Sequence, residues 1–485
     1  MQTFFWHDYE TSGADSRRDR PIQFAGIRTT LDLEPIGAPV MFYARLASDV
    51  LPHPDACLIT AIAPQDAELE GLSEAEFASR VHEQLAVPGT CTVGYNSLRF
   101  DDEFTRHMLY RNFYDPYARE WENGNSRWDL IDLARMCHAL RPEGIVWPRR
   151  DDGAPSFRLE QLARANNLDQ ERAHDALSDV HALIDLARLI RVRQPRLWDW
   201  YYALRRKQKV FELLDVVNMT PVVHVSSRYP ASRGCLSVIA PLAQHPGRNG
   251  EIIVYDLTTD PDEWLALDAE AIADRIFTSR ADLLEGVTRI PLRTVRANHV
   301  PALAPLSVLQ GVDTQRLQLD MAACMRHATK LRAAGGLVEK VCRVFQHASV
   351  PAPAEDPELA LYGGGFLADG DRKLLARVRA TPPEQLGEHA ATFRDPRYAE
   401  LLLRYRARNW PETLDVDEQA HWQAFRRARL TRHTALTTLT LDDYFGRISE
   451  LRSDPAAQDK LPLLDQLEVW GERLAGDIGV DIRVP

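Results

Sequence analysis

The chain has 485 residues, enough for two to four domains, and its 45% hydrophobic and 26% charged residues are typical of a soluble globular protein. A formal net charge of −12 excludes a protein that binds polyanions over its whole surface, so any nucleic-acid contact must come from local basic patches. Six scattered cysteines without a C-x-x-C pair argue for reduced thiols and against a structural zinc site. There is no signal-like N-terminal segment, and no stretch approaches the roughly 18 apolar residues of a membrane span, so we expect a cytoplasmic protein that does not bind membranes.

The first predicted strand carries two acidic residues. Residues 2–8 have the pattern of a buried strand that continues into Asp8-Tyr9-Glu10. Because side chains alternate between the faces of a strand, Asp8 and Glu10 point the same way. Neighbouring carboxylates are costly to bury without a cation, and Mg²⁺ prefers such oxygen-rich sites. A solvated pair on an edge strand also explains an isolated D-x-E, so the metal interpretation depends on further acids downstream.

The next elements predict the fold class. Strand-like segments cover 22–30 and 40–45, and their short connections indicate an antiparallel meander. Helical periodicity begins near Ser73, and a strand returns at 90–95. This order predicts a mixed sheet with helices, in the α/β class.

A third acid follows that strand. Gly94-Tyr95-Asn96 ends the strand, and a helix begins near Asp101 and continues to Arg111. An acid in a first helical turn complements the helix dipole, which is a sufficient explanation for it alone. The same arrangement also aims a third carboxylate at a site beside the strand.

The segment 110–150 is rich in aromatic and basic residues. Interleaved rings and guanidinium groups suit the stacked bases and phosphates of a single strand, although most of the rings can equally belong to the core. A loop from Trp147 to Pro155 precedes a helix that we expect Ser156 to cap and that carries Arg158.

A histidine and a fourth acid flank the start of a later helix. His174 precedes an apolar-periodic helix that runs to Leu189, and Asp179 lies in its first turns. For both to face one site, His174 must lie in the loop before the helix. A histidine there is usually a surface residue, but three acids already point to a common site.

The acids and the histidine occur in the order D-x-E … N-x-x-x-F-D … H-x-x-x-x-D. Such a set suits phosphodiester hydrolysis with two metal ions about 4 Å apart. His174, which titrates near neutrality, can take the proton from the attacking water.

The remainder of the chain changes character twice. Residues 188–209 are locally basic, and Pro195 marks a boundary before alternating strands and helices from about 215 to 345. A Pro-Ala-Pro linker at 351–353 precedes an almost entirely helical pattern. We therefore place three domains at 1–190, 195–349 and 354–485.

The motif set is that of the DEDD exonuclease superfamily in its histidine-bearing branch. Over essentially the whole chain, the sequence resembles the bacterial exodeoxyribonuclease I family. The segments that carry this resemblance are 5–11, 94–103, 110–117, 125–129, 139–144, 155–160 and 405–409.

The resemblance implies an RNase H-like exonuclease domain, an SH3-like β-barrel domain with helical insertions and a C-terminal helical domain. It implies processive degradation of single-stranded DNA from the 3′ end to 5′-mononucleotides, in DNA repair, the response to DNA damage, and recombination. It also implies two Mg²⁺ ions, with Mn²⁺ as a substitute, and a clamp completed within one chain, from which we expect a monomer.

Carried over by motif, Asp8, Glu10 and Asp179 bind metal, Asp101 completes the acidic set and His174 is the base. Asp102 stands beside Asp101, but the motif places Asp101 in the ligand position. The residues expected to touch the substrate are Glu10, Arg158, Arg106, Tyr117, Trp121 and Arg135.

The family also binds the acidic C-terminal tail of single-stranded-DNA-binding protein through a basic, partly apolar pocket. Arg141 is the candidate for that pocket, and the basic stretch 188–209 can contribute to it, line the DNA groove, or form a solvated helix.

Two other functions remain open. An RNA-trimming exoribonuclease consists of little beyond the exonuclease domain, so the roughly 290 further residues argue against it. A non-catalytic single-strand DNA clamp would not need the complete set of four acids and a histidine.

Overall fold

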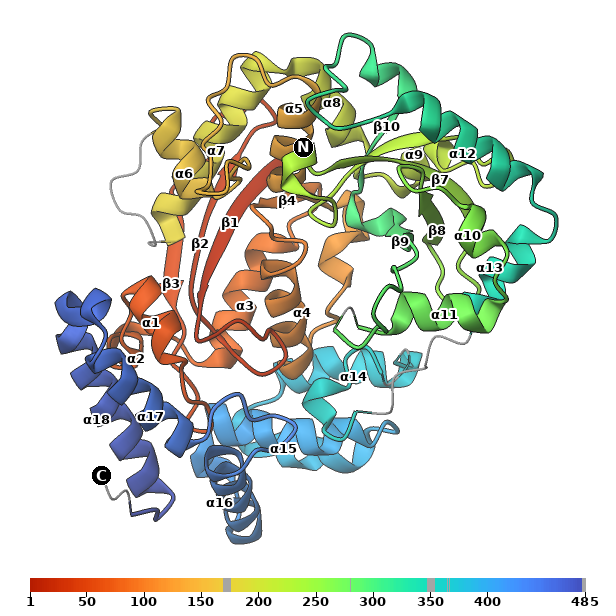
Figure 1. Ribbon diagram of the computed structural model, residues 1–485. Helices are drawn as coiled ribbons and strands as arrows, with labels where there is room; N and C mark the ends of the chain where they lie inside the picture. Colours follow the sequence, from red (N-terminus) through yellow and green to blue (C-terminus); the bar gives the residue numbers. More distant parts are fainter. Residues whose placement is uncertain (169–175, 280, 347–353, 364, 366, 482–485) are drawn as a thin grey trace. The chain divides into compact units, whose positions relative to one another are not determined.

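The computed structural model describes residues 1–168, 176–279, 281–346, 354–363, 365 and 367–481 (Figure 1). The chain divides into two compact units. The first consists of Met1–Ser126, Glu171–His181 and Pro351–Pro485, and the second of Arg127–Gln170 and Ala182–Val350. No helix in the described part of the chain has both the length and the apolar character that a membrane span requires.

The first unit is organised around strand β1. The sheet has the order β3-β2-β1-β4-β5, and the division between the units falls within β5. Strand β1 pairs antiparallel with β2, where Asp8 lies opposite Ala25, and parallel with β4. The predicted strands and the antiparallel start are therefore confirmed. The strands are β1 (Thr3–Thr11), β2 (Pro21–Thr29), β3 (Val40–Tyr43), β4 (Thr90–Gly94) and β5 (Ser126–Asp129).

Helices cover this sheet, as the α/β prediction required. Ser73 caps α3, because its hydroxyl accepts a hydrogen bond from the amide of Glu76 at 3.3 Å. Rings of β1 and β2, including Phe5 and Phe24, pack with Phe77 of α3 in one buried cluster. The helices of this part are α1 (Pro54–Thr60), α2 (Pro64–Glu70), α3 (Glu74–Leu85), α4 (Asp101–Arg111) and the start of α7 (Ala176–Arg193).

The C-terminal part of the first unit is helical, as predicted. It packs against the segment from Leu46 to Leu58 through a large apolar cluster around Tyr444 and Trp470. The helices are α14 (Asp369–Ala380), α15 (Arg397–Asn409), α16 (Val416–Thr431), α17 (Leu441–Arg452) and α18 (Leu461–Asp477).

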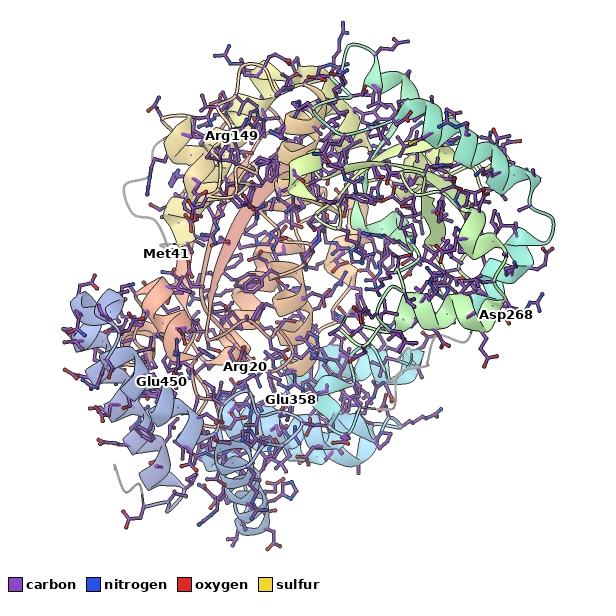
Figure 2. All side chains as sticks on the ribbon, in the orientation of Figure 1. Arg20, Met41, Arg149, Asp268, Glu358 and Glu450 are labelled. Atoms are coloured by element: carbon purple, nitrogen blue, oxygen red, sulfur yellow. The ribbon has the colours of Figure 1, made fainter. Side chains whose placement is uncertain are left out.

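A buried network of charges also joins the two ends of the sequence within this unit. Asp49 accepts from Arg408 at 2.8 Å and from Arg429 at 2.6 Å. Glu358 accepts from Arg20 at 2.9 Å and from Arg408 at 2.6 Å (Figure 2). The side chains of these five residues are almost completely buried, so each charge depends on its partners.

The second unit contains an antiparallel sheet in the order β10-β6-β7-β8-β9. The first three of its strands in the sequence were predicted, whereas β9 and β10 were not. The strands are β6 (Val222–Val225), β7 (Leu236–Gln244), β8 (Glu251–Asp256), β9 (Leu292–Arg296) and β10 (Ala302–Pro305). The inserted helices are α10 (Asp262–Leu265), α11 (Ala269–Phe277), α12 (Met321–Ala333) and α13 (Leu337–Gln346).

Further helices complete the second unit, namely α5 (Leu130–Leu140), α6 (Leu159–Ala165), most of α7, α8 (Pro195–Ala203) and α9 (Lys207–Leu213). The predicted cap of α6 was wrong. The helix begins only at Leu159, so Arg158 occupies the N-cap position. The hydroxyl of Ser156 instead accepts from the amide of Arg158 at 3.4 Å, before the helix begins.

Candidate functional site

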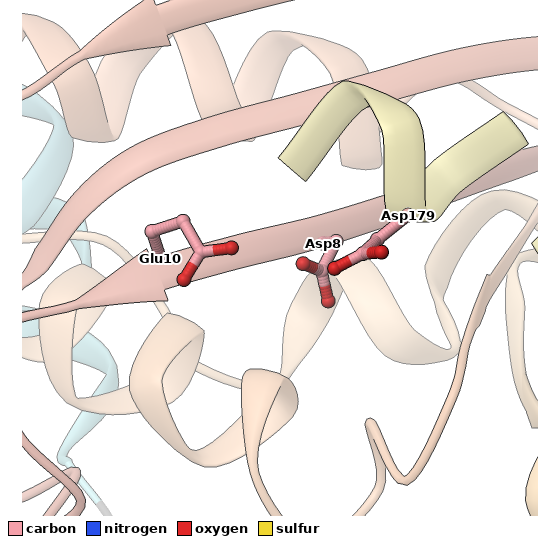
Figure 3. A group of neighbouring side chains, drawn as sticks. All are labelled: Asp8, Glu10 and Asp179. Atoms are coloured by element: carbon pink, nitrogen blue, oxygen red, sulfur yellow. The ribbon is translucent and has the colours of Figure 1, made fainter. Parts of the chain in front are cut away.

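Three carboxylates come together at the end of β1. Asp8 and Glu10 extend from this strand and Asp179 from the beginning of α7 (Figure 3). One oxygen of each carboxylate lies within 4.8 Å of the others, so the three could hold one metal ion. Glu10 is buried, whereas Asp8 and Asp179 are half-buried, which leaves the cluster open on one side.

The electrostatics of Asp8 extend the cluster to a fourth acid. Burial raises the pKa of the Asp8 carboxyl well above its ordinary value. The negative charges of Asp101, Glu10 and Asp179 raise this pKa further, in that order of effect. Ionising all four acids together is unfavourable without a compensating positive charge. The oxygen-only donor set and this mutual repulsion fit a hard divalent cation.

The local sequence explains how Asp101 reaches this cluster. After β4, the chain turns so tightly that a Cβ atom at Gly94 would lie 2.5 Å from the Cβ of Ser97, and Asn96 has a positive φ of 64°. Thr105 of α4 then donates to the carbonyl of Asp101 at 2.8 Å. Its hydroxyl also lies 2.9 Å from that of Tyr9, which fixes the start of α4 to β1.

Asp102 has a different environment from Asp101. Its Oδ1 accepts from Nη2 of Arg119 at 2.5 Å, and both side chains are buried. The pairing of Arg119 with Asp102 was not predicted from the sequence, because nothing in the immediate neighbours of Arg119 distinguishes it from the other arginines of the segment 110–150. The structure thus gives Asp102 a fixed cation within the protein, whereas the charge of Asp101 acts on Asp8.

His174 lies within 169–175 and therefore outside the described residues. Two positions after it, Ala176 begins α7 and donates its amide to the side-chain oxygen of Gln23 at 3.3 Å. Strand β2 thus holds the first residue of the helix that carries Asp179.

The residues of the first unit that we expect to contact the DNA strand differ in their surroundings. Arg106 is buried and donates to Glu120 at 2.7 and 2.9 Å and to Glu103 at 2.6 Å. Its guanidinium carbon lies 5.4 Å from the ring centre of Tyr117. Trp121 leaves 64% of its surface exposed, so its ring is accessible for stacking.

Two of the residues that we expect to contact the DNA strand, Arg135 and Arg158, belong to the second unit. Arg135 donates to Asp132 at 2.6 Å, and its guanidinium carbon lies 5.8 Å from the ring centre of Phe157. Arg158 is exposed at the start of α6, and among the described residues no acid forms an ion pair with it.

Arg141, the candidate for partner binding, also lies in the second unit. It donates to the carbonyls of Val308 and Gln310 and lines a cavity of about 540 Å³. The lining is partly basic and largely apolar, with Arg141, Arg196, Pro195, Leu197, Trp200, Pro305 and Val308 among its members.

Comparison with known families accounts for nearly the whole chain. Residues 5–187 match the family model "Exonuclease", residues 205–347 match "Exonuclease I SH3-like domain", and residues 355–474 match "Exonuclease I C-terminal domain". The predicted succession of an exonuclease domain, an SH3-like domain and a helical domain is therefore confirmed.

Two relatives are similar over most of their length. Exodeoxyribonuclease I of Haemophilus influenzae is 43% identical over 98% of this chain and 99% of its own. Exodeoxyribonuclease I of Escherichia coli is 46% identical over 89% of this chain and 90% of its own.

Three solved structures of exonuclease I are similar to this structure, and each match covers 98% of this chain and 100% of the solved chain. E. coli exonuclease I in complex with a dA16 oligonucleotide has a TM-score of 0.93 at 43% identity. The zinc-bound form of an E. coli complex of this enzyme with single-stranded DNA has a TM-score of 0.91 at 42% identity. A structure of SSB/exonuclease I in complex with the inhibitor CFAM has a TM-score of 0.89 at 41% identity. By its fold, its acidic cluster and its similarity over almost the entire length, the chain belongs to the exodeoxyribonuclease I family.

Proposed function

We propose that this protein degrades single-stranded DNA processively from the 3′ end and releases 5′-mononucleotides. The observation that carries the proposal is the convergence of the Asp8, Glu10 and Asp179 carboxylates, with the charge of Asp101 acting on Asp8. Relatives of the same domain composition act on DNA, and one is bound to an oligonucleotide.

We infer that the acids hold two Mg²⁺ ions, which Mn²⁺ can replace. All four side chains offer oxygen ligands, and hard cations prefer such a set, although a relative has been crystallised with zinc. When bound, such a pair of ions activates a water and stabilises the leaving 3′ oxygen. In this scheme Asp8, Glu10 and Asp179 are the ligands and Asp101 completes the set.

The remaining steps fall to other residues of the chain. His174 precedes Asp179 by five positions and would accept the proton of the attacking water. The carboxylate of Glu10 would also orient the terminal nucleotide. Arg158, exposed and without an acid partner among the described residues, would bind a phosphate, and the exposed ring of Trp121 would stack on a base.

We propose further that the cavity around Arg141 binds the acidic tail of single-stranded-DNA-binding protein. Arg141 and Arg196 supply positive charge, and Trp200 and Pro305 supply apolar surface for the end of a peptide. A related structure contains SSB together with exonuclease I. The test is fluorescence anisotropy with a labelled acidic tail peptide, for which Arg141→Glu should weaken binding about tenfold or more.

The nuclease proposal is tested with a 5′-labelled single-stranded oligonucleotide. Stepwise shortening of DNA in Mg²⁺, lost in EDTA and in Asp8→Ala, is the expected result. A preference for short RNA would instead indicate an RNA-trimming enzyme, and binding without cleavage would indicate a DNA clamp.

A further inference from the structure

A second cavity in the second unit has no part in the proposed nuclease site. It has a volume of about 260 Å³ and lies beside the end of α5 and the loop that follows it. Two aromatic residues, His138 and Trp147, and two arginines, Arg149 (Figure 2) and Arg316, line it. Small residues of the segment 231–234 form another part of its wall.

The aromatic wall is held in place by its own contacts. The rings of Trp147 and His138 meet edge to face, with centres 5.2 Å apart, and His138 makes the same kind of contact with Phe157 at 5.5 Å. The indole N–H of Trp147 donates to the carbonyl of Pro142 at 2.9 Å. A ring fixed in this way offers a preformed surface on which a planar base can stack.

The two arginines give the cavity its charge. Each donates to backbone carbonyls, Arg149 to Gly153 at 2.9 Å and Arg316 to Ala139 at 2.6 Å. In the part of the chain that the structure describes, neither arginine forms an ion pair. The one acid among the described lining residues, Asp152, forms an ion pair with Arg150 at 3.1 Å. The positive charge of the cavity is thus largely uncompensated.

The two arginines also affect the pKa of His138, which lines the same cavity. Burial lowers the pKa of His138 to about 4, and the positive charges of Arg316 and Arg149 contribute to this shift. At neutral pH the imidazole is uncharged, so the wall is an aromatic surface beside two guanidinium groups.

We propose that this cavity is a second nucleotide-binding site, which takes a nucleoside 5′-monophosphate group. The phosphate would lie between Arg149 and Arg316, whose planar guanidinium groups match its oxygens, and the base would lie against Trp147. The choice of this ligand rests on the proposed function, since that reaction releases 5′-mononucleotides. The same chemical group occurs in the DNA strand, so the source is either free product or a nucleotide of the bound strand.

Free product is tested with labelled dTMP and the full-length protein in EDTA, by equilibrium dialysis. Arg149→Ala should weaken dTMP binding about tenfold or more, because it removes a charge-assisted hydrogen bond. Arg149→Lys should restore part of the affinity. Arg326→Ala is the matched control, because it removes an exposed arginine of α12 that does not line the cavity.

Whether the ligand is a nucleotide of the bound DNA strand is tested with an oligonucleotide that carries 5-bromodeoxyuridine. Ultraviolet crosslinking to Trp147, lost in Arg149→Ala, would support the site with the strand as its ligand even if free dTMP does not bind. The inference is overturned if Arg149→Ala changes neither dTMP binding nor crosslinking. It is equally overturned if dTMP binding is lost only in Asp8→Ala, or if only an acidic peptide binds the cavity.

The wild-type nuclease assay separates this inference from the proposed function. Binding of dTMP that depends on Arg149, in a protein that does not shorten DNA, would remove the nuclease proposal and leave the second site. If the protein shortens DNA but shows neither dTMP binding nor crosslinking, the nuclease proposal stands and the second site is removed.

Discussion

Asp102 and Arg119 form a buried ion pair, with 2.5 Å between Oδ1 and Nη2, one residue after the proposed ligand Asp101. Two consecutive acids in one helical turn therefore face different partners. Asp102 is neutralised inside the protein, whereas the charge of Asp101 raises the pKa of Asp8. The pair distinguishes the two adjacent acids, because Asp102 has a cationic partner within the protein and the charge of Asp101 acts on Asp8.

The first prediction separates the roles of these two acids. Asp101→Asn should lower the rate of DNA hydrolysis at least 100-fold, since even indirect changes around a metal cost 10–100-fold, while stability is retained. Asp102→Asn should lower the free energy of unfolding by about 3 kcal/mol, because it leaves the buried Arg119 with only its longer ion pair to Glu120, at 3.9 Å. Urea unfolding and a steady-state nuclease assay measure both effects. The reverse pattern would assign the ligand role to Asp102.

The second prediction concerns the cost of the acidic cluster without metal. Because its neighbours disfavour ionised Asp8, the folded state binds that proton more tightly than the unfolded state does. The metal-free protein should therefore lose stability as the pH rises from the ordinary aspartate pKa through the raised one. At neutral pH, Asp8→Asn should stabilise the metal-free protein by about 1–2 kcal/mol.

Thermal unfolding in EDTA and in Mg²⁺ measures this effect. The wild type should gain stability from the metal, whereas Asp8→Asn should gain little. Ser178→Ala, a half-buried change in the first turn of α7, is a control that retains all three carboxylates. If Asp8→Asn destabilises the metal-free protein, the acids do not repel one another as inferred.

The third prediction concerns acid denaturation. The positive charges of Arg408 and Arg429 hold the pKa of Asp49 well below its ordinary value, despite the opposing effect of burial. The ion pairs of Asp49 therefore stabilise the fold at pH values above the ordinary aspartate pKa. This contribution is lost as the pH falls through the lowered pKa of Asp49. Asp49→Asn should reduce stability at neutral pH by about 3–5 kcal/mol and flatten the fall of stability below pH 4. Asp442→Asn, an exposed acid of α17, is the control and should leave the pH profile unchanged.

Only part of the acidic cluster could be predicted from short spacings. Strand alternation places Asp8 and Glu10 on one side of β1, whereas Asp101 and Asp179 were added from the order of the motifs and the family resemblance. The partners of these acids could not be predicted, because Arg119 lies 17 residues from Asp102, and the contact depends on how the segment after α4 folds back. Similarly, β9 and β10 are short, and their polar and proline residues resemble a loop. The buried pairs of Asp49 depend on residues more than 350 positions away.

The last prediction concerns Arg106, which we expect to contact the DNA strand. Its guanidinium group already donates to Glu120 and Glu103, so a phosphate must compete with these carboxylates. Arg106→Ala should weaken binding of single-stranded DNA about tenfold, whereas Glu120→Gln should strengthen it several-fold, because it removes a negative charge that repels the phosphate. Binding is measured by anisotropy in EDTA at several salt concentrations, and the salt dependence should decrease in Arg106→Ala.

Glu122→Gln is the matched control for that experiment. It removes the same charge two residues along the chain, from an exposed side chain that does not touch Arg106. A gain in affinity for Glu120→Gln but not for Glu122→Gln would show that the carboxylate competes locally with DNA. If Glu120→Gln instead weakens binding as much as Arg106→Ala does, the carboxylate holds Arg106 in its binding position, and competition is the wrong description of the pair.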